Sequence, residues 1–261
     1  MNTISEPTAE PLSHAVAMDL QAHEFERTNA MLASLDDGDW SAQTDWSAQT
    51  DCPAWDVRRM YLHVLGASEA GASMLENLKQ LRAGYADRKR TGDPLEAAIS
   101  SAQIREREEL SASEIVTRMQ AIAPKTVRGR RRVPSMVRNH AKMAIDGPVH
   151  ESWRLGYLID TIYLRDMWMH RVDAGRATDR PLELDERHDG RIVADVVAEW
   201  ARRHGRPFTL ELAGPAGGTF AHEPESTDVE QLTFDAVEFC RILAGRDPDS
   251  ATGLMATVVP F

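Results

Sequence analysis

The chain is poor in cysteine, in aromatic residues and in long apolar runs. Of its 261 residues, 2 are cysteines, Cys52 and Cys240, and 6% are aromatic. Two cysteines so far apart cannot form the disulfide framework of a small secreted domain, and we expect them to be packing residues in a reducing cytoplasm. No stretch approaches the roughly 20 apolar residues of a membrane helix, and the polar N-terminus does not have the pattern of a signal peptide. These absences predict a cytoplasmic protein with no membrane partner.

Positive charge is also scarce. The chain has 30 Lys and Arg against 41 Asp and Glu, and its formal net charge is −11. Such a chain repels phosphates, which excludes a general nucleic-acid binder. The local exception is a basic cluster of four arginines: Arg128, Arg130, Arg131 and Arg132. This cluster is either a solvated loop or face, or a clamp for a carboxylate-bearing ligand near the mouth of a helix bundle.

Apolar residues at helical spacing dominate the first 180 residues. They predict long helices over residues 14–35, 56–81, 111–123 and 152–175, with a loop at 82–95 and a helix start at Asp93-Pro94. Ser111 and Glu114 have the spacing of a capping box at the start of the third of these helices. This pattern predicts a four-helix bundle over residues 1–180, preceded within that range by a loose arm at residues 1–13.

The pattern changes after about residue 178. Two shorter helices are expected at 188–204 and 235–244, with short strands at 207–212, 218–222 and 229–233. The glycine-rich run Gly214–Gly218 opens no helix, so we expect a turn there rather than a phosphate loop. The prediction is therefore a mainly α protein, with a four-helix bundle followed by a smaller α+β domain over residues 181–261.

An exact six-residue repeat, WSAQTD, occupies residues 40–45 and 46–51. A repeat of this length with two copies cannot build a solenoid. Our interpretation is an in-frame duplication that lengthened a surface loop, because loops tolerate insertions at small entropic cost.

Three residues form a candidate metal site. His63 lies midway along the second predicted helix, and Asp166 and His170 lie four residues apart on the last long helix. The i,i+4 spacing places both side chains on one helical face, about 6 Å apart at their Cβ atoms. Two imidazoles and one carboxylate leave coordination positions open for water or substrate, which is typical of a catalytic metal site. Asp173, one turn further on, is placed to orient one of the ligands.

Simpler interpretations of the same residues remain open at this point. Asp166 and His170 are also compatible with an ordinary ion pair on a helix surface, and His63 with a hydrogen-bonded core histidine. Arg246, just after a helix, is by default a cation that favours the helix C-terminus. The chain contains no phosphate-binding loop, dinucleotide fingerprint or serine-hydrolase elbow.

Three runs of sequence resemble one known family. DCPAWDVRRMYLHVLG (51–66), YLRDMWMHRVDAGRAT (163–178) and FDAVEFCRILAGR (234–246) are similar to signatures of the mycothiol-dependent maleylpyruvate isomerase family, which belongs to the DinB-like superfamily of metal-binding four-helix bundles. The three runs occur in the family's order, and the resemblance extends from about residue 15 to the end.

The resemblance implies a function and a set of site residues. His63, Asp166 and His170 match the metal ligands, with zinc as the expected ion, and Arg246 matches an arginine that acts at the active site. Mycothiol, an actinobacterial thiol, would supply the sulfur, so the partners are this thiol and a small electrophilic substrate, in a monomer or homodimer. The family's prototype has Glu where this chain has Asp166.

Three hypotheses follow for the function. The first is a metal- and mycothiol-dependent enzyme, either an isomerase or an S-transferase, in which a thiolate attacks an electrophilic substrate. The second is a non-catalytic or regulatory protein that holds a ligand on the same bundle, favoured by Asp166 in place of Glu. The third is a metal-free bundle in which Asp166 and His170 form a plain ion pair.

Overall fold

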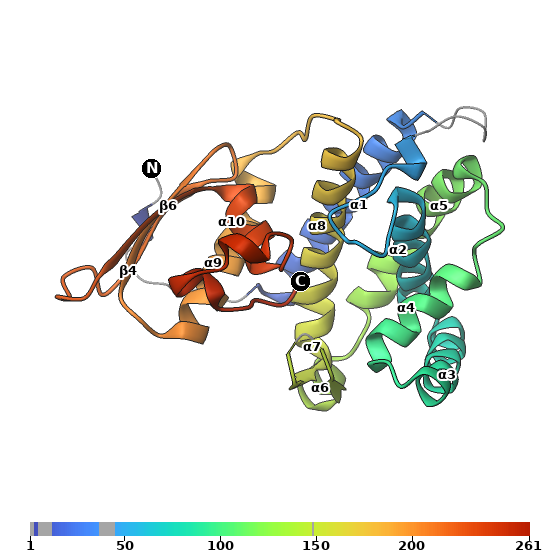
Figure 1. Ribbon diagram of the computed structural model, residues 1–261. Coiled ribbons are helices and arrows are strands. Elements are labelled where there is room, and N and C mark those ends of the chain that lie inside the picture. Colours follow the sequence, from blue (N-terminus) through green and yellow to red (C-terminus); the bar gives the residue numbers. More distant parts are fainter. Residues whose placement is uncertain (1–2, 5–11, 37–44, 148) are drawn as a thin grey trace. The chain divides into compact units, whose positions relative to one another are not determined.

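The chain folds into two compact units. The structure is a computed structural model that describes residues 3–4, 12–36, 45–147 and 149–261 (Figure 1). One unit comprises His14–Pro181, and the other comprises Met1–Ser13 together with Leu182–Phe261. The mainly α class with a smaller α+β part is confirmed. No described helix combines the length and the apolar character needed to cross a membrane.

The N-terminal residues group with the C-terminal unit and not with the bundle. Thr3–Ile4 form β1, which pairs in parallel with β5 (Gly218–His222), and this pairing accounts for the grouping. Residues 5–11 of the expected arm lie outside the described residues.

Four long helices form the core of the larger unit: α1 (His14–Ser34), α2 (Val57–Ala72), α5 (Ala112–Arg131) and α8 (Tyr163–Ala177). They pack as a closed ring, in which α2 contacts α5, α5 contacts α1, α1 contacts α8 and α8 contacts α2 (Figure 1). Large side chains such as Phe25, Leu65, Met119 and Trp168 are buried inside it. Burial of these apolar faces is the main stabilising contribution to a bundle of this kind.

The expected helix over 56–81 is wrong, because two helices occupy this region. Ser73 is extended and ends α2, and its hydroxyl then caps α3 (Met74–Thr91). The loop expected at 82–95 is also wrong, since α3 continues to Thr91 and ends at Gly92, whose φ is 82°. Gly84 does not break this helix. A Cβ there would come within 2.4 Å of Ile99, so the glycine allows α4 (Leu95–Arg105) to approach closely.

The basic cluster lies in the last turn of a helix and its cap, not in a loop. The helix expected over 111–123 is α5, which begins at the predicted Ser111–Glu114 capping box and continues through Pro124 to Arg131. Packing of α5 against α1 and α2 outweighs the lost backbone hydrogen bond of Pro124. Arg128, Arg131 and Arg132 are exposed, whereas Arg130 is buried.

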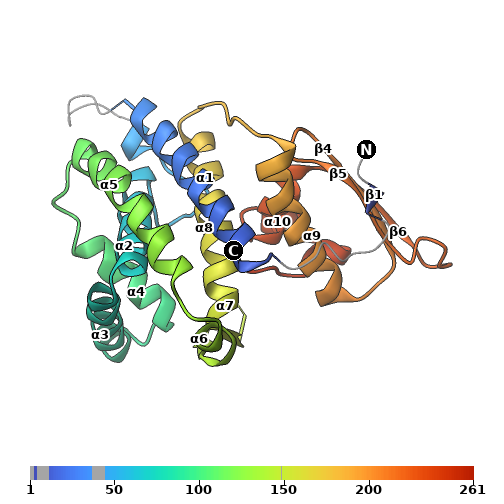
Figure 2. The same cartoon turned by 180° about the vertical axis from the view of Figure 1, so that it is seen from behind.

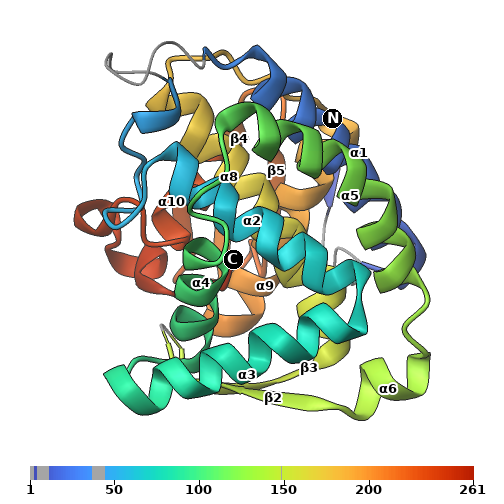
Figure 3. The same cartoon turned by 90° about the vertical axis from the view of Figure 1, so that its right-hand side faces the viewer.

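The segment before α8 differs from the single helix expected over 152–175. Helix α6 (Ser135–His140) is followed by an antiparallel hairpin of β2 (Lys142–Ile145) and β3 (Glu151–Arg154) (Figure 3). Pairing with β2 keeps residues 151–154 extended. The chain then turns through α7 (Leu155–Tyr157) and a turn of π-helix, η2 (Leu158–Ile162), into α8.

The smaller unit contains a four-stranded sheet in the order β1-β5-β4-β6, with β4 at Phe208–Ala213 and β6 at Glu230–Asp235. A turn at Gly214–Gly217 joins β4 to antiparallel β5, as expected from the sequence, and β6 is parallel to β4. Helices α9 (Arg191–His204) and α10 (Ala236–Leu243) lie on one face of the sheet (Figure 2), and a π-turn (Glu186–Gly190) precedes α9. Short 3-10 turns at Pro248–Ser250 and Gly253–Ala256 follow α10.

Replacing Gly129 tests the close crossing of α2 and α5. A Cβ at this position would lie 2.3 Å from the backbone oxygen of Gly71, an atom that cannot move without shifting α2. We expect Gly129→Val to lower the free energy of unfolding by about 1–3 kcal/mol, measured by urea unfolding. Gly147→Ala is the control, because its Cβ would meet nothing closer than 3.8 Å. Equal stability of the two variants would contradict the crossing.

Candidate metal centre

A short loop before α2 shapes one side of the candidate site. The second WSAQTD copy builds it: Trp46 is 4% exposed, and the side chains of Gln49 and Thr50 both donate to the Trp55 carbonyl, at 2.9 and 2.6 Å. This copy is therefore a loop with Ser47 and Gln49 at its surface, and the buried side chains of Trp46 and Thr50 anchor it. The first copy, apart from Asp45, lies outside the described residues. The loop holds the Trp55 ring 5.0 Å from the His63 ring, centroid to centroid.

A chain of amides behind His63 fixes its tautomer. Gln80 donates from Nε2 to the Gly66 carbonyl at 2.9 Å, and Gln103 donates from Nε2 to Gln80 Oε1 at 2.7 Å. Gln103 Oε1 therefore accepts from His63 Nδ1–H, at 2.8 Å. Because the Gly66 carbonyl can only accept, it sets the direction of every hydrogen bond in this row. The lone pair of His63 is therefore left on Nε2.

Gly66 makes this arrangement possible. A Cβ at Gly66 would lie 2.7 Å from Gln103 Cβ, so the glycine allows α4 to bring its amide against α2. The sequence interpretation missed Gln103 and Gln80, since neither belongs to a recognisable motif. The available signal was the glycine three residues after His63, one turn further along the same helix.

The three predicted ligands lie together. His170 Nε2 is 3.2 Å from Asp166 Oδ1, and His63 Nε2 is 3.9 Å from Asp166 Oδ2. One ligand atom from each of the three lies within 4.8 Å of those of the other two. The two imidazole rings are perpendicular, with centroids 5.7 Å apart. Asp166 is the most open of the three, with 28% of its side chain exposed.

The other nitrogen of His170 faces a second carboxylate. Asp173 is fully buried, and its Oδ2 lies 3.6 Å from His170 Nδ1. Cys52 Sγ donates to the same oxygen at 3.7 Å. Cys52, His170 and Asp173 thus form a second group of potential metal-binding atoms that shares His170 with the first. Asp173 is positioned as the sequence suggested, one turn beyond His170, where a carboxylate orients a ligand imidazole.

The charges at the site oppose the effect of burial. Burial alone lowers the pKa of His170, but the carboxylates of Asp166 and Asp173 outweigh it and raise this pKa to about 9. For Asp166 burial acts to raise the pKa, and the neighbouring His170 and His63 hold it well below the usual range of a carboxyl group. The cluster therefore favours a positive charge in its centre, which either protons on the imidazoles or a metal ion would supply.

The donor set fits a divalent metal. His170 is 3% exposed, and neither of its ring nitrogens makes a hydrogen bond of acceptable geometry. Buried polar atoms that lack a hydrogen bond are costly, and a cation beside the ring and its carboxylates would reduce this cost. Two Nε2 atoms and one carboxylate facing one another are ligands that suit zinc. His63, Asp166 and His170 are the residues that would hold it.

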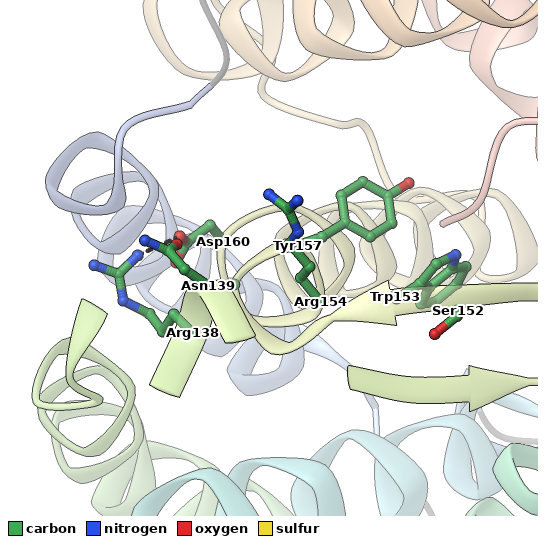
Figure 4. A pocket seen from close by; sticks show the side chains of 8 residues that line it. Arg138, Asn139, Ser152, Trp153, Arg154, Tyr157 and Asp160 are labelled. Atoms are coloured by element: carbon green, nitrogen blue, oxygen red, sulfur yellow. Dashed lines mark hydrogen bonds and ion pairs between the residues drawn. The ribbon is translucent and has the colours of Figure 1, made fainter. Parts of the chain in front are cut away.

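A buried ionic network anchors the start of the helix that carries Asp166 and His170. Asp160, in η2, contacts His14 of α1 at 2.6 Å and Arg138 of α6 at 3.0 Å. Asp160 and Arg138 line one side of a hollow of about 340 Å³, with Arg154, Tyr157 and Trp153 around its remainder (Figure 4). The network joins three elements at the point where the chain enters α8, and it therefore fixes the direction of that helix.

Arg246, the fourth predicted site residue, belongs to the smaller unit. It follows Gly245, whose φ is 74°, at the end of α10. Its backbone N–H donates to the Arg241 carbonyl at 2.9 Å, and its Nη1 donates to the Ala244 carbonyl at 3.3 Å. These contacts agree with a helix C-terminal cation. Cys240, in α10, is fully buried and is a packing residue, as expected.

The larger unit is thus a four-helix bundle with a His–Asp–His donor set in its interior. Comparisons with known proteins identify the kind of bundle. Residues 21–175 match the family described as "Mycothiol maleylpyruvate isomerase N-terminal domain", and the chain belongs to this family. No match was found among curated proteins.

Two solved structures share the fold. One is a crystal structure of the mycothiol-dependent maleylpyruvate isomerase, with 13% sequence identity, a TM-score of 0.56 and coverage of 93% of this chain and 92% of the other. The second is a histidine-to-alanine mutant of the mycothiol-dependent maleylpyruvate isomerase, with the same identity and TM-score and coverage of 94% of both chains. The fold likeness extends over both units of the chain, whereas the family match covers the bundle.

The pKa of His170 predicts how the stability of the metal-free protein depends on pH. Its folded pKa, about 9, lies above the ordinary histidine value of 6.5, so its stabilising contribution is complete below pH 6.5 and is lost as the pH rises through 9. We expect the free energy of unfolding, measured with urea after chelation, to fall by about 3 kcal/mol at most over this range.

His170→Gln removes this titration and flattens the pH dependence. His140→Gln is the matched control, because His140 is exposed and its Nδ1 donates to the carbonyl of Met136, one turn earlier, at 2.8 Å. A pH dependence that is the same in His170→Gln and in the unmodified protein would contradict the assignment.

Proposed function

We propose that this protein is a metal-dependent enzyme that uses mycothiol, a low-molecular-weight thiol, to isomerise a small electrophilic substrate or to transfer sulfur to it. The observation that carries the proposal is the His63–Asp166–His170 cluster in a bundle of the maleylpyruvate isomerase family. We further propose zinc as the metal and the cytoplasm as the location. As a monomer or homodimer, the protein would act on small molecules and on neither nucleic acid nor membranes.

The residues of the site have distinct roles in this proposal. His63, Asp166 and His170 hold the metal, which when bound lowers the pKa of a coordinated thiol towards neutrality. The Gln103 amide keeps the His63 lone pair on Nε2, and Asp173 orients His170 from the opposite side. The Trp55 ring, 5.0 Å from His63 and 5.8 Å from His170, covers the two imidazoles and limits access of water.

The two reactions share their first step. A thiolate adds to the β-carbon of a conjugated double bond, and the electron pair moves to the carbonyl oxygen to form an enolate. Rotation about the new single bond and loss of the thiolate give the isomer. Capture of a proton at the α-carbon retains the sulfur and gives the S-adduct. A cationic group near the developing enolate stabilises both outcomes, and we propose Arg246 for this role because it matches an arginine of the family.

The first test is metal content together with thiol chemistry. Purified protein should retain about one divalent metal per chain, and His170→Ala should lose it, whereas His140→Ala should keep it. Mycothiol and a panel of conjugated electrophiles should then give isomer or S-adduct, detected by mass spectrometry, in the metal-loaded protein and not after chelation. Arg246→Ala should lower kcat/KM by about 10²-fold or more while metal content stays unchanged.

Two outcomes separate the alternatives. Retention of metal with binding of mycothiol, but no product from any electrophile, would reject the enzyme in favour of a ligand-binding protein. Equal metal content in His170→Ala and the unmodified protein, with no effect of chelators on the melting temperature, would reject the metal site itself.

A further inference from the structure

One arginine of the basic cluster is buried, whereas its neighbours are exposed. Arg130 is 5% exposed, whereas Arg128 and Arg132 are exposed and Arg131 pairs with Asp19 at the surface. On α5, Arg130 follows Met119, Ala123 and Thr126 at spacings of four, three and four, so it continues the face that is buried in the bundle. The guanidinium therefore lies inside the four-helix ring.

Arg130 has no carboxylate partner among the described residues. Its Nη1 donates to the neutral Gln21 Oε1 at 2.8 Å, and its guanidinium carbon lies 4.1 Å from the centre of the Tyr163 ring. Its Nε is buried and makes no hydrogen bond. Burial lowers the pKa of Arg130 to about 10, against the opposing influence of Tyr163 and Asp166. A buried cation without an anion is energetically costly, unless a ligand supplies the anion.

The position of Arg130 relates it to the candidate metal centre. Tyr163, Asp166 and His170 lie at i, i+3 and i+7 on α8 and thus share one helical face. Arg130 lies over Tyr163, one turn of α8 away from Asp166, and the charge of Asp166 acts on both residues of the pair. Tyr163 and Asp166 are both half-buried, so part of each side chain on this face is accessible to solvent.

The backbone is shaped around this side chain. A Cβ at Gly71 of α2 would come within 2.9 Å of Arg130 Nε, so a larger residue there would displace the guanidinium. Among aromatic faces and amides a guanidinium keeps its charge and its fork of donors, and this geometry matches a carboxylate.

We propose that Arg130 binds an anionic group, a carboxylate, of the small molecule that occupies the centre, and so determines which electrophiles enter. This inference rests on the proposed function, which places the reacting end of the substrate at the candidate metal centre. A carboxylate at Arg130 leaves the rest of a short ligand one helical turn away, beside Asp166 and His170. Arg130 is thus a specificity-determining residue, distinct from the metal-holding residues and from Arg246.

The test uses metal-free protein and a pair of probes that differ in charge alone. Crotonate is a short unsaturated carboxylate, and crotonamide is its neutral counterpart of the same shape. With ¹⁵N-labelled protein, crotonate should shift the Nε–H resonance of Arg130, which is assigned by its absence in Arg130→Lys, and crotonamide should not. Crotonate affinity should fall about tenfold or more in Arg130→Met, and by less in Arg130→Lys, which keeps the charge but not the fork.

Arg128→Met is the matched control, since Arg128 lies two residues earlier on α5 and is exposed. It should bind crotonate as the unmodified protein does. If Arg130→Met fails to fold, the Arg130→Lys variant and the resonance shift in the unmodified protein still show whether Arg130 binds the carboxylate. Equal binding of crotonate and crotonamide, or unchanged crotonate affinity in Arg130→Lys with no shift of the Nε–H resonance, would overturn the proposal.

The outcome is independent of the proposed metal chemistry. Crotonate binding at Arg130 in a protein that carries no metal as purified, and that takes up none when metal is added, would reject the proposed function and leave the anion site standing. A metal-retaining, catalytically active protein that does not distinguish the two probes would reject the anion site alone.

Discussion

The organisation of the larger unit depends on the two carboxylates that face the ring of His170. Asp166 lies 3.2 Å from Nε2 and Asp173 lies 3.6 Å from Nδ1, and both belong to the same helix as the histidine. A buried imidazole between two acids must carry a proton or bind a cation, because the charges of the buried Asp173 and the half-buried Asp166 are energetically costly when uncompensated. Other features hold the elements that carry Asp166, His170, Asp173 and their partner His63. These features are the Gln103–Gln80 chain, the Trp55 loop and the Asp160 network.

The two groups of potential ligands that share His170 would bind a metal through different donor atoms. In the first, Nε2 joins His63 and Asp166, with Asp173 behind it as the orienting carboxylate. In the second, Nδ1 joins Cys52 and Asp173. The first is favoured, because the amide chain directs the His63 lone pair to the same point as His170 Nε2, and because the Asp166 side of the cluster is the more open one. Cys52 then supports Asp173 through their contact, and in the proposed function the reacting thiol belongs to the cosubstrate.

Site residues and helix boundaries could be predicted from the sequence where they depend on local spacing. They were missed where they depend on tertiary contacts. The i,i+4 spacing of Asp166 and His170 needs only a helix, so their common face follows directly from the pattern. Gln103 was missed because its contact with His63 depends on how closely α4 approaches Gly66. Arg130 could have been distinguished from the other arginines by extending the helical phase of α5 beyond Pro124, but the helix expected from the sequence stopped at residue 123. The break at Ser73 was missed because apolar residues continue across it, although Met74 and Leu75 are exposed.

The most direct test of the account is X-ray absorption at the zinc edge of the zinc-loaded protein, recorded without added thiol. The account predicts nitrogen and oxygen ligands at about 2.0–2.1 Å, with imidazole scattering that decreases in His63→Ala. A zinc–sulfur distance of about 2.3 Å would assign the metal to Cys52 and contradict the account. A spectrum unchanged by His63→Ala would contradict it as well.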